Sequence, residues 1–259
     1  MPDDLTLLTD AARRAGDIAM RYFKAEPQVW DKPGGAGPVT EADLAVDKML
    51  RESLLAARPS YGWLSEETED TAARLSAERV FIIDPIDGTR AFIEGSGGWA
   101  HSLAIAEAGQ VTAAVVYLPV SGRMYRAALG QGAFLDDAPI SASKTARLEG
   151  ATLLAARPAM DIWHWQDGSV PPVTRKFRSS LAYRMSLVGQ GRYDAMLTLR
   201  ASWEWDIAAG ALIVSEAGGI VSDRRMAPLR FNTPGAQTNG VLAAGAALHP
   251  LLGACLSQA

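Results

Sequence analysis

The sequence has one cysteine, no long apolar run and no block of basic residues. Because Cys255 is alone, no disulfide can form within the chain. No apolar stretch is long enough to span a bilayer, and the start Met1-Pro2-Asp3-Asp4 is acidic, unlike a signal peptide. The 25 basic residues are outnumbered by 29 acidic ones, and the net charge is −4. We therefore expect a soluble, cytoplasmic protein with neither a membrane nor a nucleic-acid polymer as partner.

Histidine is also scarce, with 3 in the chain. No arrangement of Ser, His and Asp or of Cys and His that would form a nucleophile stands out. His101 lies in a strand-like run, where we expect it to make a structural hydrogen bond. His164 lies between two tryptophans in an irregular stretch and receives no role. The sequence therefore does not indicate covalent catalysis by a side chain.

What the chain does contain is an apolar run followed by carboxylates, a glycine and a hydroxyl. Val80–Ile83 reads as a strand buried on both faces, and Pro85 biases Asp84 toward extended geometry, so the strand should end there. Gly88 permits a tight turn with positive φ. Thr89 then opens a helix, whose first N–H groups are free to hold an anion.

Asp84 and Asp87 lie three residues apart beside this helix start. Two carboxylates would repel a phosphate there unless cations lay between them, which points to a metal-assisted phosphoryl site. The alternative is a strand followed by an Asx turn, in which both aspartates only cap backbone groups. The motif alone leaves both interpretations open.

Three further segments end in carboxylates. Thr40-Glu41-Ala42-Asp43 has the form of a capping box at a helix start. Glu66 and Glu67 follow a short strand-like run, and paired glutamates there are usually solvated. Asp206 suits the N-cap of a helix that ends near Gly218, a plausible C′ residue. Capping or solvation therefore explains each segment as well as chemistry does, if each is taken alone.

Together, the segments resemble the inositol monophosphatase superfamily, whose members are Mg²⁺-dependent, often lithium-sensitive phosphomonoesterases. Asp84-Pro85-Ile86-Asp87-Gly88-Thr89 is similar to its first signature, and the W-D-x-A-A-G…E-A-G-G string from Trp205 is similar to its second. The T-x-x-D segment at Thr40 and the S-E-E segment at Ser65 match in order. The resemblance extends from residue 5 to about residue 250.

The resemblance implies an α/β fold, a layered αβαβα sandwich. Residues 1–259 would form a single compact domain of two packed halves, approximately 1–145 and 146–259. The helix–strand order along the chain is compatible with this fold. Short strand-like runs between Ala100 and Ala156, separated by turn residues, predict a mostly antiparallel meander.

The resemblance also implies a site. It assigns Mg²⁺ ligation to Glu66, Asp84, the Ile86 carbonyl, Asp87 and Asp206, with two ions and room for a third, weaker one near Glu66. Hard oxygen ligands suit Mg²⁺. The implied catalytic residues are Asp43, Thr89 and Glu66, with Asp43 and Thr89 orienting the attacking water. The backbone N–H groups of Gly88 and Thr89 would hold phosphate oxygens.

The predicted substrate depends on finer resemblances. Arg90-Ala91-Phe92 and Leu64-Ser65-Glu66-Glu67 are closer to the 3′(2′),5′-bisphosphate nucleotidases than to inositol-selective members, and Arg184 lies where nucleotidases often carry lysine. The glutamate that inositol-selective members place before the W-D aspartate is absent from Met196 to Arg200. We therefore expect a bisphosphate nucleotidase that binds substrate through Arg90 and Arg184. The alternatives are an inositol-1-monophosphatase or other small sugar phosphatase, and a regulatory interaction protein that retains the metal site. A homodimer is what the family suggests.

Overall fold

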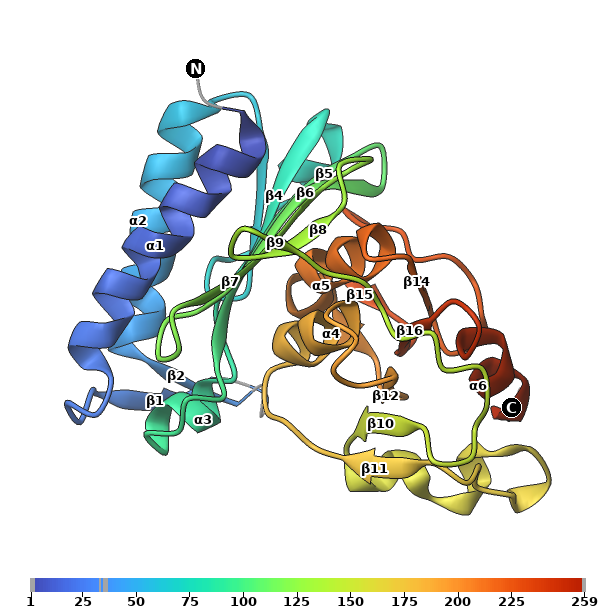
Figure 1. Cartoon of the computed structure of the whole chain (residues 1–259). Helices are drawn as coiled ribbons and strands as arrows, with labels where there is room; N and C mark the ends of the chain where they lie inside the picture. Colours follow the sequence, from blue (N-terminus) through green and yellow to red (C-terminus); the bar gives the residue numbers. More distant parts are fainter. Residues whose placement is uncertain (1–2, 33, 35–36, 258–259) are drawn as a thin grey trace.

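The computed structural model describes residues 3–32, 34 and 37–257. Figure 1 shows helices and sheets in alternating layers, in the order α1 and α2, a seven-stranded sheet, α4 and α5, a five-stranded sheet, and α6. This arrangement confirms the predicted layered α/β sandwich. The division into halves near residue 145 stays a prediction, although one sheet lies before that point and the other after it.

The first layer consists of α1 (Asp4–Tyr22) and α2 (Glu41–Ala57). Apolar residues of both helices, such as Leu8 and Leu50, pack with the seven-stranded sheet. The capping box predicted at the start of α2 is confirmed, since the Thr40 side chain accepts from the Asp43 backbone N–H and Asp43 accepts from the Thr40 N–H. This cap fixes the direction in which α2 presents the Asp43 carboxylate.

The seven-stranded sheet has its strands in sequence order. They are β3 (Gly62–Ser65), β4 (Arg79–Asp87), β5 (Ala100–Glu107), β6 (Gln110–Leu118), β7 (Arg123–Ala128), β8 (Ala133–Leu135) and β9 (Ala138–Pro139). β3 pairs with β4 in parallel and the remaining pairs are antiparallel, which confirms the predicted meander from Ala100 to Leu135. The last run of that prediction, Thr152–Ala155, lies instead in the second sheet, where it has parallel neighbours. Phe81 packs with α1 and α2, whereas Ile82 packs with α4 and α5, because successive side chains point to opposite faces.

The end of β4 differs from the prediction. The strand does not stop at Asp84 but continues through Asp87, with a shift of register against β5 between these two residues. The restriction that Pro85 imposes is on the preceding residue, and extended geometry there is compatible with a bulged strand. Gly88 has the predicted positive φ, 102°, and the short helix α3 (Thr89–Ile93) begins directly after it.

The five-stranded sheet has the order β11-β10-β12-β16-β14. Its strands are β10 (Thr152–Ala155), β11 (Thr174–Lys176), β12 (Ala195–Thr198), β14 (Gly219–Ser222) and β16 (Val241–Gly245). β10 is parallel to both of its neighbours, while β16 is antiparallel to both of its own. The sheet buries residues on both faces, against α4 and α5 on one and α6 on the other.

Helices α4 (Leu181–Gly189) and α5 (Glu204–Glu216) lie between the sheets and pack against each other. Asp206 is not the N-cap of α5, as the sequence suggested, because the helix already begins at Glu204 and Asp206 lies in its first turn. Gly218 follows the C-cap with φ of 81°, as predicted. The position of Asp206 inside the helix leaves its carboxylate free for another role.

The outer layer holds α6 (His249–Cys255) and the short 3-10 segments η3 (Arg157–Met160), η4 (Ile162–His164) and η5 (Gln166–Gly168). Another, η2 (Ala72–Ser76), precedes β4. Two small sheets pair β1 (Val29–Asp31) with β2 (Pro38–Thr40) and β13 (Ser202–Trp203) with β15 (Gln237–Thr238). The glycines and prolines of residues 33–38 predict a loop, of which residues 33, 35 and 36 lie outside the described residues. Across the described chain, no helix has the length and apolarity needed to cross a membrane.

Candidate active site

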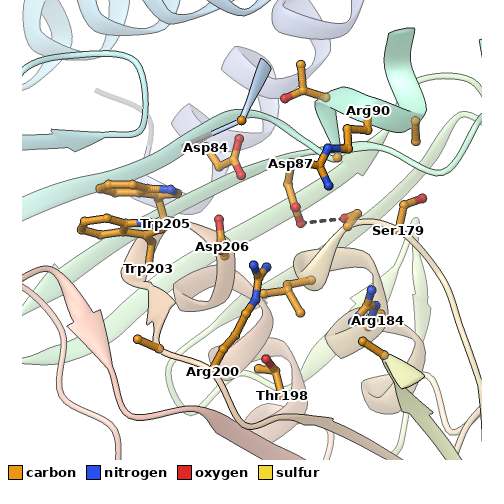
Figure 2. Close-up of a pocket in the computed structure, with 18 of the residues that line it drawn as sticks. Asp84, Asp87, Arg90, Ser179, Arg184, Thr198, Arg200, Trp203, Trp205 and Asp206 are labelled. Atoms are coloured by element: carbon orange, nitrogen blue, oxygen red, sulfur yellow. Dashed lines mark hydrogen bonds between the residues drawn. The ribbon is translucent and has the colours of Figure 1, made fainter. Parts of the chain in front are cut away.

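Three carboxylates from separate elements meet in one place. Glu66 follows β3, Asp84 lies in β4 and Asp206 lies in the first turn of α5. One carboxylate oxygen of each lies within 4.8 Å of the others. Figure 2 shows Asp84 and Asp87 on the strand and Asp206 on the helix opposite, all directed into a common space. The parallel pairing of β3 with β4 brings Glu66 beside Asp84, since Ser65 lies opposite Ile83.

Asp84 is the most buried of the three, with 1% of its surface exposed. Burial raises the pKa of Asp84 well above its usual value, and repulsion from Glu66, Asp87 and Asp206 raises it further. Its Oδ1 atom has no hydrogen-bond partner among the described residues. A buried, unpartnered carboxylate oxygen beside two other carboxylates is the donor set that a hard divalent cation needs. These residues therefore fit a Mg²⁺ site.

Asp87 faces the same space but is also tied to the next layer. Its Oδ2 accepts 2.7 Å hydrogen bonds from the Ser180 hydroxyl and from the Ala182 backbone N–H at the start of α4. Burial raises the pKa of Asp87 to about 6, although these two hydrogen bonds lower it. The Ile86 carbonyl, the predicted backbone ligand, accepts from the Thr89 hydroxyl at 3.2 Å. Asp87 is thus fixed by α4 while Ile86 belongs to the bulge.

Asp43 and Thr89 form a hydrogen-bonded pair at the edge of this space. Asp43 Oδ2 accepts from the Thr40 backbone N–H and hydroxyl, whereas Oδ1 lies 3.3 Å from the Thr89 hydroxyl. Asp43 is 1% exposed, and burial raises its pKa to about 6. One carboxylate thus caps α2 with one oxygen and contacts Thr89 with the other.

Lys32 and Glu67 extend the charged cluster and were not predicted. Lys32 Nζ lies 2.7 Å from both Glu66 Oε1 and Glu67 Oε1, which contributes to raising the pKa of Lys32 to about 12. Burial, together with repulsion from Glu66, raises the pKa of Glu67 to about 7. The S-E-E segment could have drawn attention to Glu67. The sequence around Lys32, in contrast, has no pattern that predicts its contact with the two glutamates after β3.

The turn at Gly88 is closely packed. A Cβ atom at this position would lie 3.2 Å from the Gly98 carbonyl oxygen and 3.3 Å from the Trp99 Cα, in a backbone conformation with φ of 102°. Steric crowding and positive φ both require glycine here. The turn therefore holds the backbone of Gly88 and Thr89 close beside Asp87.

These groups line a pocket of about 860 Å³. Three arginines, Arg90, Arg184 and Arg200, line the same pocket. Arg184 is 8% exposed; its Nε atom donates to the Arg178 carbonyl, and its guanidinium lies 4.6 Å from the centre of the Phe177 ring. Burial lowers the pKa of Arg184 to about 10. No acidic side chain in the described ranges forms an ion pair with any of the three arginines.

Aromatic rings line the same pocket. Trp203 stacks on Trp205 with ring centres 4.6 Å apart and an angle of 9° between the planes. Figure 2 shows this pair on the other side of Asp84 and Asp206 from Arg184. Trp203 keeps 42% of its surface exposed, so one large apolar surface remains available in the pocket. Of this pair, the sequence marked only Trp205, as part of the second signature.

A comparison with known sequences identifies the protein family in which this arrangement of residues occurs. The sequence profile described as the inositol monophosphatase family matches residues 3–258. The chain belongs to the inositol monophosphatase family. That result confirms the predicted superfamily and makes the chain a phosphatase that acts on phosphomonoesters.

The proteins that this chain is similar to carry different names. The chain is 36% identical to a glucose-1-phosphate thymidylyltransferase of Streptomyces griseus (86% of each chain). It is 32% identical to an inositol-1-monophosphatase of Rhizobium meliloti (85% of each) and to a histidinol-phosphatase of Chlorobaculum parvum (87% of each). Among solved structures, it resembles the extragenic suppressor protein suhB from Bartonella henselae, with a TM-score of 0.83, 27% identity and 98% of each chain covered.

The expected bisphosphate nucleotidase finds no support in these relatives. Their names favour the alternative, an inositol monophosphatase or another phosphatase of small metabolites. The nucleotidase prediction depended on Arg90 and Arg184, on the L-S-E-E segment and on a missing glutamate, and both arginines do line the pocket. Two arginines in this pocket are compatible with several anionic substrates. Similarity over a few residues was therefore too weak to distinguish a bisphosphate nucleotidase from an inositol monophosphatase.

Proposed function

We propose that the chain is a Mg²⁺-dependent phosphomonoesterase of small polyol phosphates, with inositol 1-phosphate as the first substrate to test. The observation that carries the proposal is the meeting of Glu66, Asp84 and Asp206 around a buried, unpartnered carboxylate oxygen. The names of several relatives support the polyol substrate. Glu66, Asp84 and Asp206 would hold one or more Mg²⁺ ions, with Asp87 and the Ile86 carbonyl as further oxygen ligands.

When bound, Mg²⁺ would neutralise the phosphate charge and make a water molecule more acidic. The chain's own residues orient that water. The Thr89 hydroxyl has one proton and two acceptors, Asp43 Oδ1 at 3.3 Å and the Ile86 carbonyl at 3.2 Å. With its proton turned toward Asp43, the hydroxyl oxygen can accept a hydrogen bond from water, and Asp43 can take up the proton that is released.

The phosphate would bind at the turn before α3. We propose that the backbone N–H groups of Gly88 and Thr89 donate to its oxygens, because both residues line the pocket next to Asp87. Arg90, which is exposed in the pocket, adds positive charge on the same side. The alcohol portion of the substrate would then extend toward Arg184, Arg200 and Trp203.

A substrate with a second anionic group is the second candidate, and one observation favours it. Arg184 is buried without an acidic partner, although a buried charge normally requires one. The carboxylates that line the pocket are Glu66, Asp84, Asp87 and Asp206, so no other acidic side chain in the described lining receives sugar hydroxyls. A bisphosphate would supply the charge that Arg184 lacks.

Phosphate release from a panel of esters at fixed Mg²⁺ tests both candidates. The panel contains inositol 1-phosphate, histidinol phosphate, glycerol 3-phosphate and 3′-phosphoadenosine 5′-phosphate, each with Mg²⁺ and with a chelator. The first candidate predicts the highest kcat/KM for inositol 1-phosphate and no turnover without metal. The opposite ranking favours a bisphosphate. Absence of turnover for every ester by folded protein would leave the interaction-protein alternative.

Two further family expectations belong to this proposal. We propose that lithium inhibits the enzyme and that two copies associate. Inhibition at increasing Li⁺ and fixed Mg²⁺ tests the first, with Na⁺ as the matched salt. Light scattering of the purified chain gives the mass that tests the second.

A further inference from the structure

His101 is buried beside the metal-binding motif, and the proposed chemistry does not use it. It lies in β5 with no exposed surface, between Trp99, whose ring centre is 5.5 Å away, and Tyr117 at 6.3 Å. Its Nδ1 atom is hydrogen-bonded to the Pro85 carbonyl of β4. A carbonyl only accepts, so Nδ1 carries the proton and donates. Burial lowers the pKa of His101 to about 4, so the ring is neutral near pH 7.

The partner of this hydrogen bond lies at the irregular point of β4. Asp84 pairs with Ser102 and Asp87 pairs with Ala100, so two residues of β4, Pro85 and Ile86, lie opposite His101 alone. Two residues facing one is the definition of a β-bulge. The side chain of the single residue opposite the bulge thus bonds to the backbone of the bulge itself.

The bulge sets the direction of three proposed metal ligands. In a regular strand, successive residues point to opposite faces, so Asp84 and Asp87 would lie on opposite faces of the sheet. The extra residue in the bulge turns both carboxylates toward the same space (Figure 2). The Ile86 carbonyl is the backbone group between them, and it lies within reach of the Thr89 hydroxyl. Any relaxation of the bulge would move these groups apart.

We infer that His101 is a positioning residue of the metal site. Its Nδ1–H holds the Pro85 carbonyl and thereby keeps the bulge in the form that directs Asp84, Ile86 and Asp87 toward one cation. The other ring nitrogen, Nε2, has no partner among the described residues, so only the donor at the δ position is used. An asparagine, whose Nδ2 is a donor at the equivalent place, should therefore substitute for it. The inference rests on the proposed metal site.

The experiment compares variants that keep or lose this donor. His101→Asn keeps it, whereas His101→Leu fills similar space without a donor. If the leucine variant does not fold, His101→Met serves, because methionine fits irregular space. Leu103→Ala is the control, since Leu103 lies two residues along β5 in the same sheet and pairs with Ile83, before the bulge. Mg²⁺ binding to each folded, chelator-treated protein is measured by calorimetry, together with the Mg²⁺ concentration that gives half-maximal phosphatase activity.

We expect the donor-less variant to bind Mg²⁺ at least about tenfold more weakly, and His101→Asn to remain within about threefold of the unchanged protein. Leu103→Ala should lower the melting temperature and leave Mg²⁺ binding unchanged. The inference is overturned if the donor-less variant binds Mg²⁺ normally, if asparagine fails to rescue, or if Leu103→Ala weakens Mg²⁺ binding equally. Failure of the unchanged protein to bind Mg²⁺ would instead refute the proposed function, and with it this inference.

Discussion

Two sets of charged side chains line the pocket and differ in how they are arranged. We call Glu66, Asp84, Asp87 and Asp206 the acidic wall, and Arg90, Arg184 and Arg200 the basic wall. In the acidic wall, burial and then repulsion between the carboxylates raise the pKa values of Asp84 and Asp206. In the basic wall Arg184 is buried over an aromatic ring without an acidic partner.

Opposite charges in one pocket could have formed ion pairs, which would have lowered the cost of burial on both sides. Lys32 forms an ion pair with Glu66, but among the described residues no arginine of the basic wall forms an ion pair with the acidic wall. Asp84, Asp87, Asp206 and the three arginines thus have no ion-pair partner in the described protein. A cation would complete the acidic wall, and an anionic substrate would complete the basic one. The following predictions separate the two walls, from the largest expected effect to the smallest.

Removing one charge from the acidic wall should abolish activity and stabilise the metal-free fold. We expect Asp84→Asn and Asp206→Asn each to lower kcat/KM by about a thousandfold or more, because an anionic ligand is lost. The same changes remove a buried carboxylate that the neighbouring carboxylates repel. The melting temperature of the protein in chelator should therefore rise. Phosphate release and thermal unfolding are measured on one preparation. Near-normal turnover by either folded variant would refute the assignment of the acidic wall.

The Asp43–Thr89 pair lies at the edge of the acidic wall. Substitutions in this pair should lower kcat more than they weaken Mg²⁺ binding. Thr89→Ala and Asp43→Asn are expected to lower kcat about a hundredfold, since they orient water but do not anchor the cation. The half-saturating Mg²⁺ concentration should stay within about twofold. Thr89→Ser keeps the hydroxyl and serves as the matched control. If Asp43 is only a cap, Asp43→Asn will lower the melting temperature and spare kcat.

Changes in the basic wall should alter substrate preference and leave metal binding intact. Arg184→Met should raise KM about tenfold for an ester with a second anionic group and about twofold or less for inositol 1-phosphate, with kcat little changed. Arg175→Met, which removes an exposed arginine outside the pocket, is the control. Equal effects on both esters would mean that Arg184 binds the scissile phosphate or supports the fold, and not a second anion.

The smallest expected effect is a change in the melting temperature of the metal-free protein with pH. The pKa values of Asp43 and Asp87 are raised to about 6 and that of Glu67 to about 7. Between about pH 4 and 7 these three carboxyls hold more protons in the folded state than in the unfolded state, so their contribution to stability falls as pH rises. His101, whose pKa burial lowers to about 4, works in the opposite direction but is a single group against the three carboxyls. We expect the melting temperature in chelator to drop by several degrees across this range.

Added Mg²⁺ should remove most of that drop, because a cation compensates the carboxylates as they ionise. The Asp84→Asn variant should show a smaller drop in chelator than the unchanged protein. A melting temperature that rises between pH 4 and 7 without metal would show that the acidic wall is not under repulsion.

Short-range rules predicted much of the fold and part of the site. The capping box at Thr40, the positive φ at Gly88 and the C′ glycine Gly218 are each decided within about one turn of the chain, and all three agree with the structure. The same rules misplaced the end of β4 and the start of α5. A bulge depends on the neighbouring strand, and the N-cap depends on where β13 ends, so neither could be determined locally.

The carboxylates of the site were found in the sequence as candidates, each with capping or solvation as an equal explanation. Only the tertiary structure shows that three of them meet, because parallel pairing of β3 with β4 and the docking of α5 bring Glu66, Asp84 and Asp206 within 4.8 Å. Lys32, Arg200 and Trp203 carry no local pattern that marks them, and they join the site through the positions of the strands and helices that hold them. By itself, the sequence determined the local geometry and the available chemistry. Which groups meet was decided by packing, since contacts across more than a hundred residues depend on sheet register and helix docking.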